Sequence, residues 1–174
     1  MTLSHEHESY GRFLGRLAVT LTEEMGLPIK EGGSTTLRRR RKQRGLEPDN
    51  CYWIGREPLV RGKLRIDLRV DPAPDLAIEV DIAHSSLDRM AIYAALGIPE
   101  VWRFDGQDLT FHLLGVNGQY DVIPYSPSFP PITAVEVANF LPLRLHLDEN
   151  AVVAKFRAWI RQHHAPGSTG QSAP

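Results

Sequence analysis

The sequence predicts a single domain of mixed helices and strands, of the α/β or α+β class. The predicted elements run in the order helix, strands, helix, strands, helix, and no internal repeat or interdomain linker interrupts them. A chain of 174 residues is also long enough for one domain with a hydrophobic core. We expect this domain to span residues 1–164 and a disordered tail to follow over 165–174.

Composition and charge are those of an ordinary globular protein. Apolar residues make up 42% of the chain and charged residues 24%, and the formal net charge of -1 gives no global basic field. The single cysteine, Cys51, excludes an intrachain disulfide and fits a reducing compartment. No apolar run approaches the ~20 residues of a membrane span, and no secretion leader is recognisable. We therefore expect a cytoplasmic protein without membrane contact.

The elements follow from periodicity and end signals. Residues 6–25 predict an amphipathic helix, because apolar side chains recur at three- and four-residue steps, and Gly26 and Pro28 end it. A second helix is predicted over 85–96, with Ser85 as its N-cap, and Asp148 opens a C-terminal helix. Strands are predicted at 29–30, 34–38, 50–54, 74–82, 100–104, 109–114 and 120–123.

The most informative strand has the sequence PDLAIEVDI, residues 74–82. Because side chains alternate along a strand, one face is large and apolar and the other carries three acids, Asp75, Glu79 and Asp81. Like charges on one face of a core strand are costly unless something compensates them. A divalent metal ion would do so, and Mg²⁺ and Mn²⁺ prefer such oxygen ligands. The alternative is a solvated sheet face.

Two further residues can join this strand. Asp49 precedes the 50–54 strand, so pairing of the two strands as a hairpin would bring Asp49 and Glu79 to one cation. Arg89 lies on the first turn of the helix that follows, where a cation and the helix N-terminus can orient a phosphate or a metal-bound water. The alternative for Arg89 is a surface arginine paired with Asp88.

Charge also gathers at two other places. A basic run precedes Asp49 and could contact a nucleic-acid backbone, although a solvated basic loop is the alternative. The head of the first helix reads HEHE, where His5 and His7 do not share a helical face and so form a poor zinc site. His7 or Glu8 could still reach a cleft. The basic run consists of Arg38, Arg39, Arg40, Arg41, Lys42 and Arg44.

Two motifs are missing from the sequence, and their absence narrows the function. There is no glycine-rich phosphate loop with its lysine, which argues against a P-loop nucleotidase. There is also no G-x-S-x-G turn, which argues against a serine hydrolase of the nucleophile-elbow type.

The segment PDLAIEVDIAHSSLDRMAIYAALGIPEVWRFDG resembles the core signature of the Uma family of restriction endonucleases, within the PD-(D/E)XK nuclease superfamily. The earlier segment GGSTTLRRRRKQRGLEPDNCYWI resembles the hairpin that precedes it, so the likeness spans most of residues 5–145. The resemblance implies an α/β restriction-endonuclease-like fold, with a central mixed β-sheet flanked by helices. It also implies metal-assisted hydrolysis of a phosphodiester.

The resemblance further implies roles for individual residues. Asp49 matches the metal-binding aspartate of the superfamily, and Glu79 matches the first acid of the (D/E)XK element. The lysine of that element would stand two residues on, where this chain has Asp81. The family's relocated lysine lies four residues before the tyrosine, which is Tyr93 here, and that position is Arg89.

An arginine stays charged, so Arg89 could clamp a phosphate but could not act as a general base. The superfamily often places a glutamate on its first helix, and Glu8 is the candidate for it. The expected catalytic residues are therefore Asp49, Glu79, Asp81, Arg89 and Glu8, of which Asp49, Glu79 and Asp81 would bind the metal.

The expected function is Mg²⁺- or Mn²⁺-dependent cleavage of DNA. A homodimer is expected, because cutting two strands calls for two sites. The alternative is a catalytically silent protein of the same fold that binds nucleic acid or a protein partner through the same cleft. We also expect Leu76, Ile78 and Val80 to be buried against a helix.

Overall fold

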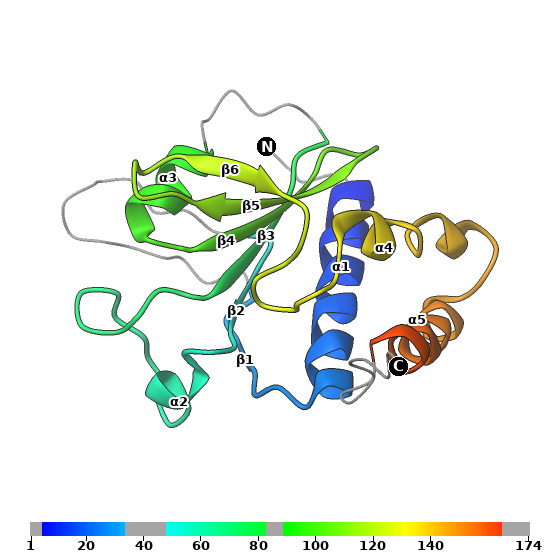
Figure 1. Cartoon of the computed structure of the whole chain (residues 1–174), viewed down its shortest axis with the longest axis horizontal. Helices are drawn as coiled ribbons and strands as arrows, with labels where there is room; N and C mark the ends of the chain where they lie inside the picture. The colour runs from blue at the N-terminus through cyan, green and yellow to red at the C-terminus, as the bar shows by residue number, and fades with distance from the viewer. Residues whose placement is uncertain (1–4, 34–47, 83–88, 165–174) are drawn as a thin grey trace, which may run out of the picture.

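A six-stranded β-sheet forms the centre of the computed structural model, which describes residues 5–33, 48–82 and 89–164 (Figure 1). The strands stand in chain order across the sheet. β3 and β4 are parallel and every other neighbouring pair is antiparallel, so the sheet is mixed. The strands are β1 (Lys30–Glu31), β2 (Asn50–Trp53), β3 (Leu76–Val80), β4 (Glu100–Phe104), β5 (Leu109–Leu114) and β6 (Tyr120–Ile123).

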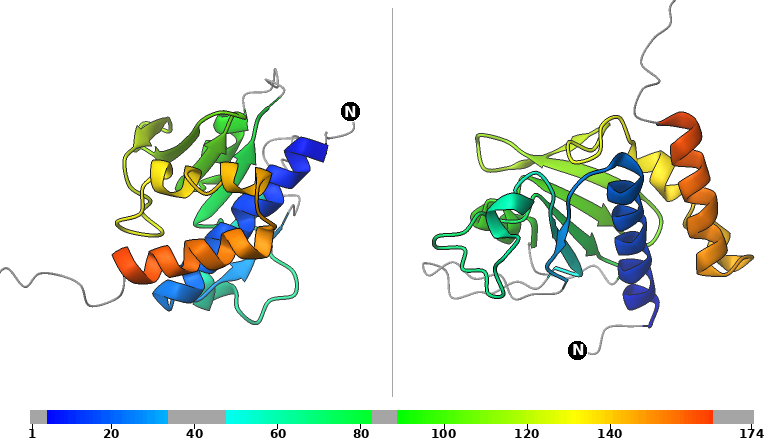
Figure 2. Two further views of the ribbon diagram at one scale, coloured as in Figure 1. Left: turned by 90° about the vertical axis from the view of Figure 1, so that its right-hand side faces the viewer. Right: turned by 90° about the horizontal axis from the view of Figure 1, so that it is seen from below.

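Helices cover both faces of this sheet (Figures 1 and 2). On one face lie α1 (His5–Met25), α4 (Ala134–Ala138) and α5 (Glu149–His163), and on the other lies α3 (Arg89–Leu96). α1 contacts β3 directly and α5 packs against α1. The α/β class with a restriction-endonuclease-like arrangement, a mixed sheet flanked by helices, is thereby confirmed.

The apolar face of β3 belongs to the larger core. Its side chains Leu76, Ile78 and Val80 are fully buried in the cluster that α1 and α5 complete, as the alternation predicts. The opposite face of the strand carries Ala77, which packs in a second cluster with Tyr93 of α3. β3 is therefore buried on both faces, and any charged side chain on it must find a partner inside the protein.

The predicted helix ends agree with the structure. α1 ends at Met25, and Gly26 follows with a φ of 65°, a left-handed conformation that favours glycine. Asp148 caps α5 by accepting a hydrogen bond from the N–H of Ala151 at 3.1 Å. The predicted strand at 34–38, the start of the second helix at 85–88 and the predicted disordered tail at 165–174 lie outside the described residues.

Three short helical turns have no counterpart among the predicted elements: α2 (Glu57–Val60), α4 and a 3₁₀ turn, η1 (Pro142–Leu145). α4 has a complete capping box, in which Thr133 and Glu136 bond to each other's backbone N–H groups. None of the helices in the described ranges is long and apolar enough to cross a membrane.

Candidate active site

Glu79 is the only acid of the LAIEV strand, and it is buried against α3. The residue is 2% exposed. Its Oε1 accepts a hydrogen bond from a terminal nitrogen of Arg89 at 2.5 Å, and its Oε2 accepts one from the hydroxyl of Tyr93. Arg89 and Tyr93 are four residues apart on α3, so their side chains share one face of that helix.

Asp49 joins Glu79 from the neighbouring strand. β2 and β3 are antiparallel with Asn50 opposite Ile78, which puts Asp49 at the position opposite Glu79. Its Oδ2 accepts a hydrogen bond from the N–H of Val80 at 2.7 Å, whereas its Oδ1 accepts none from the described residues. The antiparallel pairing of β2 and β3 therefore brings Asp49 and Glu79 together.

The N-terminal end of α1 closes the other side of Asp49. His7 is buried, with its Nε2 3.5 Å from Oδ2 of Asp49. One turn further on, a Cβ built on Gly11 would lie 3.3 Å from the Cβ of Asp49, so the helix and this acid are already in tight contact. We call the set of Asp49, Glu79, Arg89, Tyr93 and His7 the Glu79 cluster.

The two carboxyl groups of this cluster are poorly neutralised. Burial raises the pKa of Glu79 to about 7, and the charge of Asp49 adds to that rise although Tyr93 and Arg89 oppose it. Burial also raises the pKa of Asp49, against the N–H of Val80 and the charges of His7 and Arg89. Additional positive charge at this point would stabilise both carboxylates.

The other two predicted catalytic residues have charged partners outside this cluster, although the charge of Glu8 also raises the pKa of Asp49. Asp81 accepts a hydrogen bond at 2.9 Å from Arg103, on the neighbouring strand β4. The side chain of Glu8 is 46% exposed and lies 3.8 Å from Arg12, one helical turn away. Of the five predicted catalytic residues, Asp49, Glu79 and Arg89 thus meet, and Asp81 and Glu8 have other charged partners.

The third acid of the PDLAIEVDI segment, Asp75, has a structural role. Its carboxylate accepts hydrogen bonds from the N–H groups of Ile54 and Arg56, at 2.8 and 2.9 Å, and so holds the chain that leaves β2.

The basic run from Arg38 to Arg44 lies outside the described residues.

A divalent metal ion fits the chemistry of the acid pair, although the pair has no third acidic, His or Cys ligand grouped with it among the described residues. Within residues 5–33, 48–82 and 89–164, no three His, Cys, Asp or Glu side chains are grouped to hold a metal ion. Asp49 and Glu79 nevertheless offer the carboxylate oxygens that Mg²⁺ and Mn²⁺ prefer, and Oδ1 of Asp49 is without a hydrogen bond from the described chain. Their raised pKa values indicate that a cation would be stabilising there.

Two members of the Glu79 cluster are only weakly indicated by the sequence. In the sequence, Tyr93 is used only to locate Arg89, four residues before it. The same spacing on one helix places both side chains on one face, beside the same strand. His7 is expected only to be able to reach a cleft. Its burial follows from the apolar stripe of α1, since Gly11, Leu14 and Ala18 continue the same helical face.

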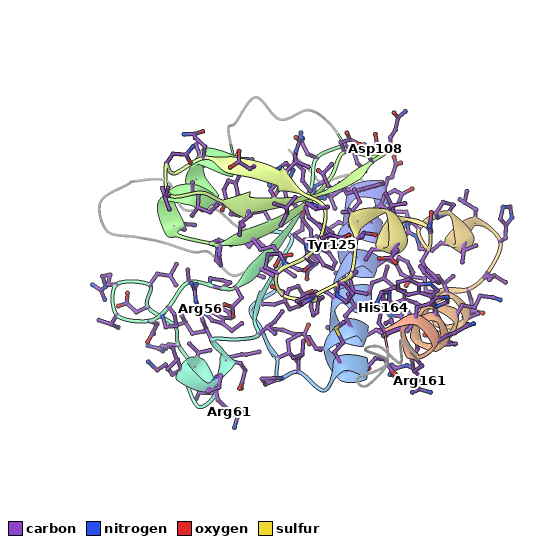
Figure 3. The ribbon with its side chains drawn as sticks, in the orientation of Figure 1. Arg56, Arg61, Asp108, Tyr125, Arg161 and His164 are labelled. Carbon is purple, nitrogen blue, oxygen red and sulfur yellow. The ribbon has the colours of Figure 1, made fainter. Side chains whose placement is uncertain are left out.

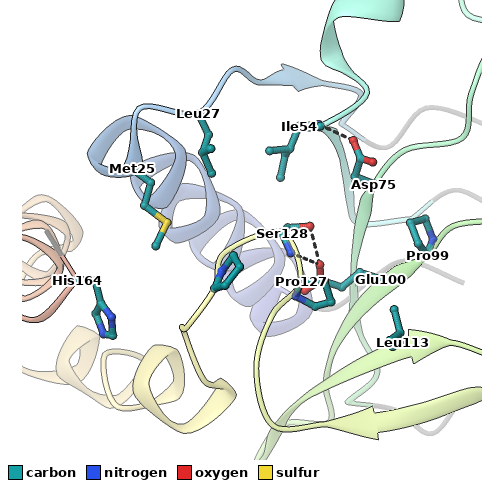
Figure 4. Close-up of a pocket in the computed structure, with 12 residues that line it drawn as sticks. Met25, Leu27, Ile54, Asp75, Pro99, Glu100, Leu113, Pro127, Ser128 and His164 are labelled. Atoms are coloured by element: carbon teal, nitrogen blue, oxygen red, sulfur yellow. Dashed lines mark hydrogen bonds between the residues drawn. The ribbon is translucent and has the colours of Figure 1, made fainter. Parts of the chain in front are cut away.

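A pocket lies at the opposite end of β3 (Figure 4). Its volume is about 560 Å³ and its walls are mainly apolar, with Asp75 and Glu100 among the lining residues. Both acids are occupied: Asp75 holds backbone N–H groups, and Glu100 accepts hydrogen bonds from the N–H and hydroxyl of Ser128. The pocket therefore offers no acid pair comparable with Asp49 and Glu79.

The comparisons with known proteins agree with this assignment of the fold. The family model described as "Uma2: Putative restriction endonuclease" matches residues 1–150, a range that includes the whole Glu79 cluster. A search for similar curated proteins finds no match. Since the family model covers most of the chain, the protein belongs to the Uma2 family of putative restriction endonucleases.

Proposed function

We propose that the protein is an endonuclease that hydrolyses phosphodiester bonds of DNA with Mg²⁺ or Mn²⁺. One observation supports this most strongly: the buried carboxylate of Glu79 and the half-buried carboxylate of Asp49, at the start of the adjacent strand, meet an arginine on the next helix. The chain belongs to a family described as putative restriction endonucleases. Carboxylates that lie close together repel each other, and a divalent cation between them relieves this repulsion.

Asp49 and Glu79 would hold the metal ion. Asp81, the third ligand expected from the sequence, accepts a hydrogen bond from Arg103 and would have to give it up to join them. The bound ion would polarise the phosphoryl group and lower the pKa of an attacking water. The protein supplies the geometry: the N–H of Val80 fixes Asp49, and the hydroxyl of Tyr93 fixes Glu79.

Arg89 would bind the phosphate that is attacked. Its guanidinium remains charged throughout, so it can stabilise the negative charge that develops on the phosphoryl oxygens. It cannot accept a proton, and the proton of the attacking water must pass to another group. We propose that this group is His7 or Asp49, whose Nε2 and Oδ2 lie 3.5 Å apart in the Glu79 cluster.

DNA would be held largely by the basic run from Arg38 to Arg44. The chain as a whole carries a net charge of only -1, so the attraction to a phosphate backbone would have to come from this local concentration of charge. Cleavage of both strands of a duplex calls for two copies of the site, and we expect a homodimer on DNA.

The direct test is nicking of a supercoiled plasmid with Mg²⁺ or Mn²⁺, repeated with excess chelator. We expect metal-dependent nicking by the wild type and none by Glu79→Gln. Glu57→Gln is the matched control, because Glu57 is another buried acid bound to an arginine, Arg61, at 2.7 Å. Equal nicking by Glu79→Gln and Glu57→Gln would show that the cluster is not the catalyst.

One observation favours an alternative, a catalytically silent protein that binds nucleic acid. Arg89 stands where the family carries a lysine, and it is ion-paired to the acid that the metal needs. This alternative predicts DNA binding that Glu79→Gln leaves intact, together with no cutting in any metal. Filter binding of a labelled duplex, run beside the nicking assay, separates the two functions.

A further inference from the structure

Both oxygens of the Glu79 carboxylate are already engaged. Arg89 binds Oε1 and the hydroxyl of Tyr93 binds Oε2. Each oxygen keeps a second lone pair that a metal ion could use, but the ion would then stand beside the positive charge of Arg89. Because like charges repel, binding of a metal ion to Glu79 favours the departure of a donor.

Of the two donors, Arg89 is the one that can leave. Tyr93 is completely buried and packs in the core between the sheet and α3, so its hydroxyl is held in place. The side chain of Arg89 is 26% exposed and reaches the cluster from the first turn of α3. Its long chain can turn toward solvent without opening the core.

The guanidinium of Arg89 also has hydrogen-bonding capacity to spare. Its Nε is buried and has no hydrogen-bond partner within the described part of the chain. A buried donor left without an acceptor costs free energy, so a bound acceptor at this point would be stabilising. Two nitrogens of one guanidinium can bind two oxygens of a phosphodiester at once, which a single carboxylate oxygen does not offer.

We propose that Arg89 competes with the metal ion for Glu79 and that a phosphodiester releases it. This inference rests on the proposed function of the same site. In the free protein Arg89 supplies the positive charge that the acid needs. When a phosphodiester takes the guanidinium, Glu79 becomes available to the metal. Metal and phosphodiester then bind cooperatively, and each raises the affinity for the other by the same factor.

The first test measures Mn²⁺ binding to the full chain from the electron paramagnetic resonance signal of free Mn²⁺. Arg89→Met removes the competing charge and keeps an unbranched side chain. We expect it to bind Mn²⁺ at least tenfold more tightly than the wild type. The control is Arg56→Met, which removes an arginine that lies 3.3 Å from another acid, Asp75, in the segment beside α2 (Figure 3). We expect this control to bind Mn²⁺ like the wild type.

The second test needs no substitution and so does not depend on the folding of a variant. Mn²⁺ binding to the wild type is measured with dimethyl phosphate and, separately, with sodium chloride at the same ionic strength. We expect dimethyl phosphate to raise the Mn²⁺ affinity of the wild type several-fold. It should not raise that of Arg89→Met, where nothing remains to be released.

Each outcome bears on a different statement. Equal Mn²⁺ affinities of the wild type and Arg89→Met would show that Arg89 does not compete with the metal ion. A wild type whose Mn²⁺ affinity dimethyl phosphate leaves unchanged would show that a phosphodiester does not release Arg89. Glu79→Gln separates these failures from a failure of the proposed function. If Glu79→Gln binds Mn²⁺ as well as the wild type, the cluster is not the metal site. If only Glu79→Gln loses Mn²⁺, the metal site stands even where Arg89 proves irrelevant to it.

Discussion

The N–H of Val80 donates a hydrogen bond to Oδ2 of Asp49 at 2.7 Å, so the first acid of the site is bound to the strand that carries the second. Val80 directly follows Glu79, and its own side chain points into the opposite core. The separation of the two acids is thereby set by strand pairing rather than by a flexible loop. Rigid placement of this kind is what a metal site with few ligands requires.

Two substitutions of Asp49 should separate the contribution of its hydrogen bond with Val80 to stability from the contribution of its charge to cleavage. Asp49→Asn keeps an oxygen that can accept from Val80, so we expect little change in stability. Its cleavage rate should fall by at least about 100-fold, because the ligand charge is lost. Asp49→Ala should lower the cleavage rate by a similar factor. It should also lower the free energy of unfolding by about 1–3 kcal/mol, because it leaves the buried N–H of Val80 without an acceptor. Urea unfolding and plasmid nicking measure the two effects. Wild-type cleavage by Asp49→Asn would remove Asp49 from the site.

The two glycines of α1 should differ in what they disturb. A Cβ on Gly15 would lie 2.7 Å from the hydroxyl of Tyr52 and 3.1 Å from Nδ2 of Asn50, so part of the contact with β2 must shift. We expect Gly15→Ala to destabilise the protein, because overpacking costs about 1–3 kcal/mol against the ~1 kcal/mol that alanine contributes to a helix.

Gly11→Ala meets Asp49 instead, at a distance of 3.3 Å that a displacement of a few tenths of an ångström relieves. Here the helix propensity of alanine, about 0.5–1 kcal/mol, should roughly offset the crowding. We expect near wild-type stability with slower cleavage, because the shift falls on a metal ligand. Urea unfolding and nicking rates of both variants test this contrast. Loss of cleavage in Gly15→Ala alone would contradict it.

Glu100 should make stability depend on pH. It is buried, and burial raises its pKa above the ordinary 4.5 although Ser126, Ser128 and Trp102 donate hydrogen bonds to it. The folded protein thus binds this proton more tightly than the unfolded chain does. The stability that the proton confers is full below the unfolded pKa and is lost as the pH rises through the folded pKa.

The Glu100→Gln variant cannot lose this proton, so its free energy of unfolding should fall less over the same rise in pH. Urea unfolding of both proteins at a series of pH values, from below 4.5 up to neutrality, gives the comparison. Glu57→Gln is a control of opposite sign: the hydrogen bond from Arg61 lowers the pKa of Glu57, so removing this acid should make the fall with rising pH steeper rather than shallower. Parallel pH profiles for the wild type and Glu100→Gln would contradict the assignment.

The basic run should control DNA affinity and its dependence on salt. Replacing Arg39 and Arg41 by glutamine removes two charges from the run and none from the Glu79 cluster. We expect weaker binding and a log–log salt slope that is shallower by about 1 for each DNA phosphate that the protein ceases to neutralise. Fluorescence anisotropy of a labelled duplex over a range of salt concentrations measures both. An unchanged slope would remove these arginines from the DNA interface.

Much of the fold could be predicted because its signals are local. Alternation placed Leu76, Ile78 and Val80 in the core, and the dipeptide Asp105-Gly106, a typical hairpin signal, lies between β4 and β5. α4 was missed although its capping box, Thr133 and Glu136, is legible in the sequence. It follows a proline-rich loop and has only five residues, so its apolar pattern is too short to show a helical period.

The site could be predicted only in part, because its partners are distant in the chain. Glu79 and Asp81 lie on the same face of the predicted strand 74–82, so alternation alone makes them equally good candidates for metal ligands. What separates them is Arg103, which β4 brings beside Asp81 from 22 residues away. Arg103 reaches Asp81 because β3 and β4 pair in parallel, and the residues close to Asp81 in the sequence do not predict that contact.

The most direct measurement is the cleavage rate of a labelled DNA duplex by Glu79→Gln relative to the wild type, with protein in excess and Mn²⁺ present. Excess protein makes the result independent of product release. If the Glu79 cluster hydrolyses DNA, the wild type cuts the duplex, a chelator stops it, and Glu79→Gln leaves the duplex whole. A duplex that the wild type leaves whole in Mn²⁺ and Mg²⁺, or that Glu79→Gln cuts as fast, would contradict this central claim.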